Sequence, residues 1–324
     1  MPQKKSGRVT IKDVAKLANV TPQTVSRVMR QNGYVSNSTK EKVLNAAASL
    51  SYIPSYAAKA LRNGMRKSIA VVFDSLINVY FAFMLDYLRK HIAQNGYSIQ
   101  LLFSNDVVIT EDLYRKAVSH GAVAVISFIE GKEGIGQTVK SCGVPLIIFG
   151  RSTTEEGLDY ITTDDVLGGR IVGQRLLDNG CTSFKYVVEG SGMTCALDRL
   201  QGFSEVLKEN GYEPEIIDVG TYGKEALNAV DFTNPKVGVF CFSDQLAFHI
   251  VKNMGLKDIK LHAKIIGYDN IQADMILPVE ITTVGIDKNA HTKFAIECVV
   301  KKIQNPSLKF AEHQAVKLFE GITA

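Results

Sequence analysis

The sequence predicts an α/β protein in which an N-terminal three-helix head, built around a helix-turn-helix, precedes a two-lobed core of doubly wound parallel sheets. Residues 9–54 contain three short amphipathic segments that begin with helix-capping residues. From residue 68 onward, short apolar runs alternate with amphipathic stretches. Charge divides the chain at the same place, because residues 1–67 hold 13 Lys and Arg against 2 Asp and Glu, whereas the remainder holds 24 against 31. The head alone is therefore suited to a polyanion.

The first helix of the head is expected to begin after Thr10. Thr10 can cap this helix, and Asp13 three residues later can complete a capping box. The predicted apolar stripe consists of Val14, Ala15, Leu17 and Ala18. A turn at residues 19–20 then leads into the second helix.

The second helix has the features of a recognition helix. Thr21 can cap it and Pro22 suits its first position, so its start is well defined. With Val25 and Val28 directed inward, the outward residues are Gln23, Thr24 and Arg27. Glutamine can pair with adenine and arginine with guanine in a major groove, so we interpret the pair as a DNA-binding helix-turn-helix. The alternative, a small helical pair with polar faces, does not explain the charge distribution.

A third helix and a linker are predicted to complete the head. Asn32-Gly33 ends the second helix, and a capping box from Ser38 to Glu41 opens the third, whose apolar residues are Val43, Leu44, Ala47 and Leu50. Residues 1–8 are predicted to form a flexible basic arm. Residues 55–64 are predicted to form a hinge helix that is disordered off DNA and helical on it. Leu61 either packs on the neighbouring domain or enters the minor groove as a wedge.

The core, residues 65–324, shows two tandem sets of strands and helices. Strands are predicted at 69–73, 98–103, 122–127, 146–149, 184–189, 215–219, 237–242 and 264–268. Helices are predicted near 81–95, 110–119, 134–141, 165–179, 196–210, 223–230 and 244–254. Two similar halves indicate two lobes, with crossovers expected near residues 162, 285 and 310. A ligand cleft is expected at the carboxyl ends of the strands.

Several classes of protein are disfavoured. The five cysteines are scattered without a C-x-x-C pair, and the six histidines show no ligand spacing, so neither a metal nor a disulfide framework is expected. The segment MPQKKSGR is not followed by an apolar run, and no apolar run reaches 18 residues, so we expect a cytoplasmic protein without a membrane partner. Motifs for nucleotide phosphates, nucleophilic serine or catalytic zinc are missing, so we expect no cofactor and no enzyme activity.

Motifs in the head and in the core carry a family resemblance. The runs VTIKDVAKLANVTPQTVSRVMR, VSNSTKEKVLNAAASLSYIPSYAAKAL, ITTDDVLGG, DRLQGF, FSDQLA and IIGYDN followed by ITTV occur in this order. This order resembles the lac and galactose repressor family of bacterial transcription regulators. The resemblance implies a homodimer that binds a pseudo-palindromic operator. It also implies a core like that of periplasmic sugar-binding proteins, closing on a small effector.

The resemblance also implies roles for individual residues. Base-reading positions match Pro22, Gln23 and Arg27, and phosphate-contacting positions match Thr21, Ser26, Tyr34, Ser36, Thr39 and Tyr52. Ala58 and Leu61 match a minor-groove pair, and Thr10 and Thr24 complete the set expected at the DNA. The effector cleft is expected to be lined by Asp74, Arg151, Arg199, Tyr222, Ser243 and Asp269.

The chemistry of the cleft residues suits a sugar. Arg199 and Asp269 offer fixed donors and acceptors for vicinal hydroxyls, and Tyr222 offers a flat face. A solvated surface role is the alternative, above all for Asp74 and Arg151. Asp164-Asp165 and Gly168-Gly169 are expected to start a helix close against the sheet rather than to bind a ligand.

The sequence departs from the family pattern near the cleft and at its end. Gly150-Arg151 replaces the usual Asp-Arg, and residues 286–288 replace a segment that usually contains proline. The chain ends in KLFEGITA, without a leucine-rich heptad tail, which favours a dimer.

The leading hypothesis is a transcriptional repressor controlled by a sugar or sugar phosphate. A purine or a phosphoprotein as corepressor is the alternative within the family. Outside it, the core alone is compatible with a small-molecule binding protein that does not regulate DNA, and doubly wound sheets also host many enzymes.

Overall fold

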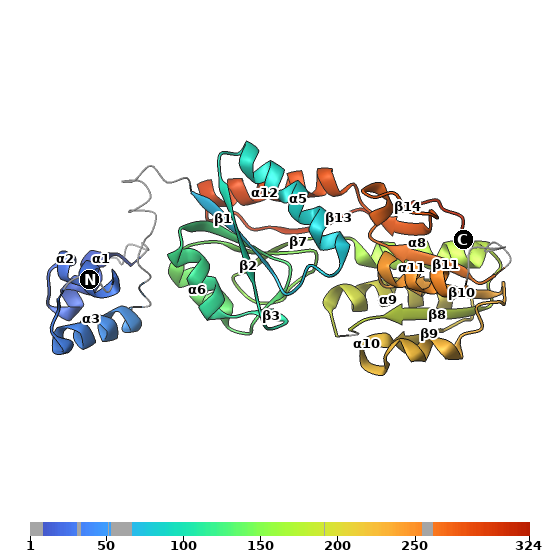
Figure 1. The fold of residues 1–324 in the computed structure, drawn as a ribbon, viewed down its shortest axis with the longest axis horizontal. Coiled ribbons are helices and arrows are strands. Elements are labelled where there is room, and N and C mark those ends of the chain that lie inside the picture. The colour runs from blue at the N-terminus through green and yellow to red at the C-terminus, as the bar shows by residue number, and fades with distance from the viewer. Residues whose placement is uncertain (1–8, 31–33, 51, 53–66, 191, 255–261) are drawn as a thin grey trace.

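The head is a three-helix unit with its own apolar core. The computed structural model describes residues 9–30, 34–50, 52, 67–190, 192–254 and 262–324, and the head helices are α1 (Ile11–Ala18), α2 (Pro22–Arg30) and α3 (Asn37–Ser49) (Figure 1). Their buried side chains form one cluster. Three predicted features lie outside the described residues: the arm at 1–8, the stop at Asn32-Gly33, and the hinge helix at 55–64 with Ala58 and Leu61.

Two of the three predicted helix caps are confirmed. The backbone N–H and the hydroxyl of Thr10 donate to Asp13 Oδ2 over 2.8 and 2.7 Å, and these bonds lower the pKa of Asp13. The N–H of Thr24 donates to Thr21 Oγ1 over 3.2 Å. The prediction that Ser38 opens the capping box of α3 is wrong, because Ser36 caps α3 by accepting from the Thr39 N–H. Ser36 has the extended ψ of 147° that a cap requires, and Ser38 lies inside the first turn.

Two predicted core positions of the head are exposed. Leu17 is 55% exposed and Leu44 is 44% exposed, whereas Val14, Ala15, Val25, Val28, Val43 and Ala47 are buried as predicted. Each exposed leucine lies two positions from a buried alanine, which is about 200° around a helix. Three short helices enclose only a narrow stripe, so these leucines fall on the outer side.

The core contains two six-stranded sheets, one in each lobe. The N-lobe sheet has the order β13-β7-β6-β4-β1-β2, and the C-lobe sheet has the order β14-β12-β11-β10-β8-β9. The N-lobe strands are β1 (Ser68–Phe73), β2 (Ser98–Phe103), β4 (Ala122–Ser127), β6 (Leu146–Phe149), β7 (Asp159–Thr163) and β13 (Ala311–Gln314). The C-lobe strands are β8 (Ser183–Val188), β9 (Pro214–Asp218), β10 (Val237–Cys241), β11 (Lys264–Tyr268), β12 (Thr282–Gly285) and β14 (Lys317–Phe319).

The pairing is parallel, as predicted, except that β14 runs antiparallel to β12. A small extra sheet joins β3 (Val108–Ile109) and β5 (Glu130–Gly131). All eight predicted core strands are present, within one residue at each end.

Helices cover both faces of each sheet. They are α5 (Val79–Gln94), α6 (Glu111–Ser119), α7 (Ile135–Cys142), α8 (Asp165–Asp178), α9 (Thr194–Glu209), α10 (Val219–Tyr222), α11 (Asp244–Met254) and α12 (Lys288–Gln304). The helix predicted near 223–230 is a 3-10 helix, η1 (Lys224–Ala229), and a second such turn is η3 (Ile271–Ala273). Helix α12 was not predicted, because its buried face includes Lys288, His291 and Lys302, which obscure the apolar period. None of the helices in the described ranges is long and apolar enough to cross a membrane.

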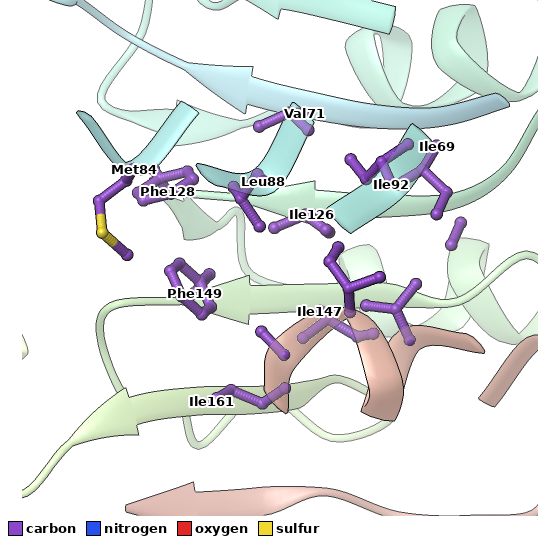
Figure 2. Packing of buried hydrophobic residues seen from close by; sticks show 14 of the residues in the cluster. Ile69, Val71, Met84, Leu88, Ile92, Ile126, Phe128, Ile147, Phe149 and Ile161 are labelled. Carbon is purple, nitrogen blue, oxygen red and sulfur yellow. The ribbon is translucent and has the colours of Figure 1, made fainter. Parts of the chain in front are cut away.

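The chain passes between the two sheets three times, after β7, after β12 and after β13. After the second passage, α12 packs along α5 over the N-lobe sheet. Its side chains Ala295, Ile296 and Val299 belong to the same apolar cluster as Met84 and the aromatic rings at the strand ends (Figure 2). The body of α12 is therefore part of the N-lobe, although the helix starts directly after a C-lobe strand.

Helices α8 and α9 pack closely through glycines. Asp164 caps α8 by accepting from the Leu167 N–H over 2.9 Å, which confirms the predicted helix start. A Cβ on Gly168 would lie 2.4 Å from Tyr268 Oη, and a Cβ on Gly202 would lie 1.9 Å from the carbonyl oxygen of Val166. These positions have no room for a methyl group, so the glycines fix the distance between α8 and its neighbours.

Replacing Gly202 with alanine should therefore destabilise the core. The added methyl meets backbone rather than a flexible side chain, so we expect a loss of about 1–3 kcal/mol or more in chemical denaturation. Gly192→Ala is the matched control, because nothing lies within 4 Å of its added Cβ. Equal stability of both variants would show that α8 and α9 can separate at no cost.

Candidate DNA-binding and effector sites

The predicted base-reading residues share one exposed face of α2. Pro22, Gln23 and Arg27 are exposed, whereas Val25 and Val28 on the other side of the helix are buried. The structure thus separates the two faces as the sequence predicted. Lysines on α1 and α3 are also exposed, at Lys12, Lys16, Lys40 and Lys42.

The other described residues predicted at the DNA are exposed or partly buried. Tyr34 is 95% exposed. Thr10, Thr21 and Ser36 are exposed, while Thr24, Ser26, Thr39 and Tyr52 are partly buried. The hydroxyls of Thr21 and Ser36 already act as helix caps. A cap at a helix start leaves neighbouring backbone N–H groups pointing outward, which is the usual geometry for a phosphate.

The six predicted effector residues do not all meet in the structure. Arg199 and Asp269 lie together on the C-lobe, and each influences the ionisation of the other. Ser243 is 2% exposed and caps α11 by accepting from the Leu246 N–H over 3.3 Å. Asp74 is exposed after β1, and Tyr222 is 74% exposed at the end of α10.

Arg151 belongs to the N-lobe and faces a carboxylate. Its Nη1 lies 3.7 Å from Glu130 Oε1, and only 12% of its side chain is exposed. Its Nε is buried and has no hydrogen-bond partner among the residues that the structure describes. At Gly150-Arg151, where the sequence differs from the family pattern, the Arg151 guanidinium that follows β6 can therefore still donate a hydrogen bond.

Arg199 is the centre of a buried polar cluster. Its Nε donates to Asp165 Oδ1 over 2.9 Å and its Nη1 donates to the Phe242 carbonyl over 2.6 Å. The guanidinium carbon lies 3.6 Å from the centre of the Tyr268 ring. Burial is the largest single influence on the pKa of Arg199 and acts to lower it, but Asp165 and the other neighbouring groups together raise the pKa well above its usual value. Arg199 is thus a permanently charged group.

Asp269 is a carboxyl group held in an unusual environment. Burial raises the pKa of Asp269 to about 7, although Arg199 and Lys288 act in the opposite direction. Its backbone has a φ of 105°, a conformation that L-residues rarely adopt. Near neutral pH this side chain can therefore both donate and accept hydrogen bonds, depending on its protonation.

The structure adds residues that the sequence reasoning missed. Burial, followed by the charge of Asp269, raises the pKa of Tyr80, so α5 of the N-lobe contributes a tyrosine to the same cluster. His291 stacks on Phe149 with 4.7 Å between ring centres, and burial lowers its pKa. Tyr80 follows the end of β1 by only seven residues, so the strand-end rule could have found it. His291 lies on α12, which was not predicted.

A cavity of ≈ 440 Å³ lies elsewhere on the C-lobe, between η1 and the end of α11. Its lining includes Lys224, Asp231 and His262. Asp231 precedes β10 and His262 precedes β11, so this part of the lining lies where C-lobe strands begin. The cavity is therefore distinct from the cluster around Arg199.

No group of three or more His, Cys, Asp or Glu in the described ranges could hold a metal ion. All five cysteines are buried.

The ionisation of Asp269 predicts a pH-dependent effect of its replacement. Because the folded pKa lies above that of an unfolded aspartate, near 3.9, ionisation of this group costs stability as the pH rises toward about 7. Asp269→Asn mimics the neutral form, so its melting temperature should exceed that of the wild type more at pH 8 than at pH 5. Differential scanning calorimetry at both pH values measures this, and a difference that does not vary with pH would contradict the assignment.

Comparison with known proteins agrees with this two-part architecture. Residues 10–55 match the model for bacterial regulatory proteins of the lacI family, and residues 174–321 match that of a periplasmic binding protein-like domain. The HTH-type transcriptional repressor PurR of Histophilus somni is 28% identical over 96% of both chains. The ribose operon repressor of Halalkalibacterium halodurans is 29% identical, covering 85% of this chain and 84% of its own.

Solved structures share the fold. The lac repressor dimer bound to operator and the anti-inducer ONPF aligns with a TM-score of 0.67 and 21% identity, covering 98% of this chain and 99% of that one. A regulator from Enterococcus faecium with bound ribose aligns with a TM-score of 0.68 and 22% identity, covering 80% of this chain and 98% of its own. The helix-turn-helix, the two-lobed core and the near full-length relatives agree: the chain combines a DNA-binding domain that matches the lacI family model with a periplasmic binding protein-like domain.

Proposed function

We propose that this chain is a sequence-specific transcriptional repressor that binds a pseudo-palindromic operator as a homodimer. The observation that carries the proposal is the exposed face of α2, where Gln23 and Arg27 are exposed to solvent and lie outside the apolar core. Such side chains read base edges when a recognition helix enters a major groove. The exposed lysines around this face would meet phosphates and make binding dependent on salt.

Exposed apolar side chains support the homodimer. Among the described strands, β2 lies at the edge of the N-lobe sheet, and its Leu101 and Phe103 are 41% and 48% exposed. Ile276 on the C-lobe is fully exposed. Apolar groups on a sheet edge favour association, and a second copy of the chain would cover them in a symmetric dimer.

The effector is proposed to bind between the lobes, next to Arg199 and Asp269. A sugar or sugar phosphate fits best, because the guanidinium of Arg199 and the carboxyl of Asp269 can hold neighbouring hydroxyls. A ribose operon repressor among the relatives and a regulator solved with bound ribose point the same way. A planar ligand such as a purine is the second candidate, favoured by the rings of Tyr80 and Tyr222.

The effector would control operator binding because its affinity differs between two arrangements of the lobes. An effector that favours one arrangement of the lobes shifts the chain toward it, and in the dimer this changes the separation of the two heads. Hinge helices at residues 55–64 would carry that change to the DNA. The chain would act in the cytoplasm and without catalysis, in keeping with relatives that are named transcriptional and operon repressors.

Arg27→Ala should weaken specific DNA binding. The operator is first selected from randomised palindromic duplexes with the wild-type protein. Loss of a bidentate arginine contact is worth about 1–3 kcal/mol, so we expect a roughly ten- to hundredfold rise in Kd for the selected duplex. Lys140→Ala, an exposed cation on α7, is the control and should leave Kd unchanged. If the wild-type protein selects no duplex over random DNA, the proposed function fails.

A thermal-shift screen of the full chain tests the effector site. We expect one class among neutral sugars, sugar phosphates and nucleobases to raise Tm, because a ligand of the folded state stabilises it by mass action. Tyr222→Ala should reduce the shift, since this exposed ring can cover a bound ligand without supporting the fold. Tyr34→Ala, which removes an exposed tyrosine of the head, should keep the shift. An undiminished shift in Tyr222→Ala would remove Tyr222 from the site.

A further inference from the structure

The backbone beside the proposed effector carboxylate is strained. Asp269 and Asn270 have φ values of 105° and 49°, so two consecutive residues with side chains occupy the left-handed region. Each such residue costs free energy and persists only when the surrounding structure holds it in place. The contacts that hold this pair therefore also determine where the Asp269 carboxyl lies.

Part of the support comes from the C-lobe itself. The N–H of Ile271 donates to Asp244 Oδ2 over 2.8 Å, and the hydroxyl of Thr283 donates to Asp244 Oδ1 over 2.5 Å. The N–H of Asp269 donates to the Val284 carbonyl over 2.8 Å. These bonds fix the amide groups on both sides of the strained pair.

The remaining support comes from the N-lobe. Lys288 is the first residue of α12, and its Nζ donates to the Asn270 carbonyl over 2.5 Å. The same Nζ lies 2.8 Å from Asp274 Oδ2, and the two side chains are 2% and 10% exposed. The body of α12 packs in the N-lobe core, so Lys288 ties a C-lobe loop to N-lobe structure.

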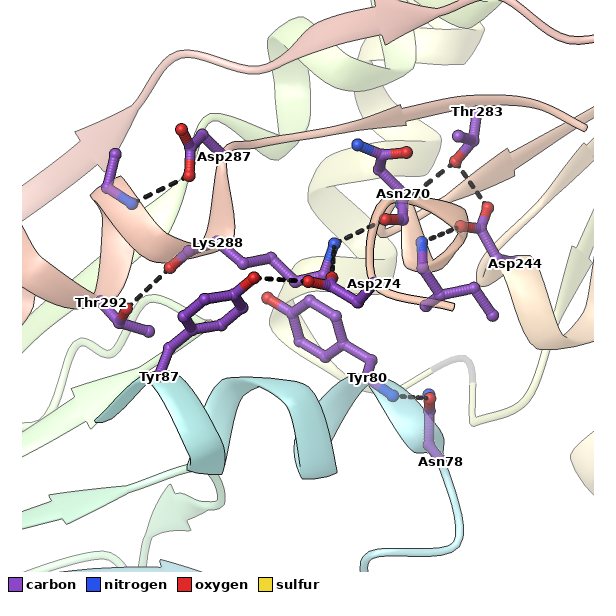
Figure 3. A network of polar contacts seen from close by, with 12 residues as sticks. Asn78, Tyr80, Tyr87, Asp244, Asn270, Asp274, Thr283, Asp287, Lys288 and Thr292 are labelled. Carbon is purple, nitrogen blue, oxygen red and sulfur yellow. Dashed lines mark hydrogen bonds and ion pairs between the residues drawn. The ribbon is translucent and has the colours of Figure 1, made fainter. Parts of the chain in front are cut away.

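Tyr87 makes a second tie at the same carboxylate. Its hydroxyl donates to Asp274 Oδ1 over 2.6 Å from the middle of α5, and this bond raises the pKa of Tyr87 to about 12. Figure 3 shows Tyr80 and Tyr87 of α5 directed toward the loop that carries Asp274, with Lys288 beside them. Both oxygens of Asp274 are thus held by N-lobe elements.

We propose that Lys288, Asp274 and Tyr87 are positioning residues that connect the arrangement of the lobes to the backbone at Asp269–Asn270. Movement of α5 away from the C-lobe breaks the Tyr87 bond first, because its hydroxyl spans the two lobes directly. The Asp274 carboxylate is then left with the Lys288 ion pair, and the Asn270 carbonyl with Lys288 and the Ala273 N–H. The strained pair thereby loses part of its support. The inference rests on the proposed function only in naming Asp269 as an effector residue.

Interlobe distances test the connection without a ligand. Nitroxides are attached at Lys140→Cys on α7 and Lys208→Cys on α9, both exposed positions, while the five native cysteines are buried. In the full chain, Tyr87→Phe should shift the distance distribution measured by pulsed electron resonance to longer and broader values. Tyr114→Phe is the matched control, because it removes a tyrosine hydrogen bond to Val144 within the N-lobe. Unchanged distances in Tyr87→Phe, or an equal change in Tyr114→Phe, would overturn the proposal.

Hydrogen exchange tests the effect on the strained pair. The Ile271 amide should exchange about tenfold faster in Tyr87→Phe, the size expected for losing a hydrogen bond to a charged group. Asp274→Asn and Asp274→Leu both lose the ion pair with Lys288, but only asparagine keeps an acceptor for Tyr87. Asp274→Asn should therefore protect the amide better than Asp274→Leu, and equal exchange in the two variants would contradict the connection. If the chain binds no selected duplex, the proposed function fails, while these distances and exchange rates still decide the inference.

Discussion

The buried guanidinium of Arg199 constrains the core at the carboxyl ends of the C-lobe strands. A buried cation must be compensated, and here Asp165 supplies the charge, Phe242 the carbonyl acceptor and Tyr268 the aromatic face. These three residues come from the start of α8, the end of β10 and the end of β11. Because all three residues contact the same guanidinium, α8 and the carboxyl ends of β10 and β11 lie close together.

The glycines of α8 allow the close packing around Arg199. Gly168 leaves room for the Tyr268 ring, and Gly169 would place a Cβ 2.1 Å from the Arg199 carbonyl oxygen. A larger residue at either position would push α9 or β11 outward and leave the Arg199 charge without its partners. The close packing and the buried charge therefore depend on each other, and losing the packing costs electrostatic as well as dispersion energy.

Much of this fold could be predicted from local patterns. Alternating apolar runs located the eight core strands named from the sequence, because buried parallel strands are apolar on both faces. Prediction failed where burial included charge, as in α12, whose Lys288 and Lys302 pair with Asp274 and Asp159. It also failed at Leu17, where three short helices bury a narrower stripe than the sequence suggests. In the polar cluster around Arg199, Arg199 and Asp269 could be found from motifs, and Tyr80 could be found from its place after β1. Lys288 and His291 could not, because they lie on α12, which the sequence did not predict.

The strained pair at Asp269–Asn270 gives a physical reason for a two-lobed design. If one lobe alone held this backbone, its conformation would not depend on the position of the other lobe. A ligand bound there would then have no effect on the DNA-binding head. Here the carbonyl of Asn270 is held by a lysine on a helix that belongs to the opposite lobe. The free energy that holds the site in shape therefore depends on how the lobes lie, and by linkage a ligand that uses the site must in turn influence the lobes.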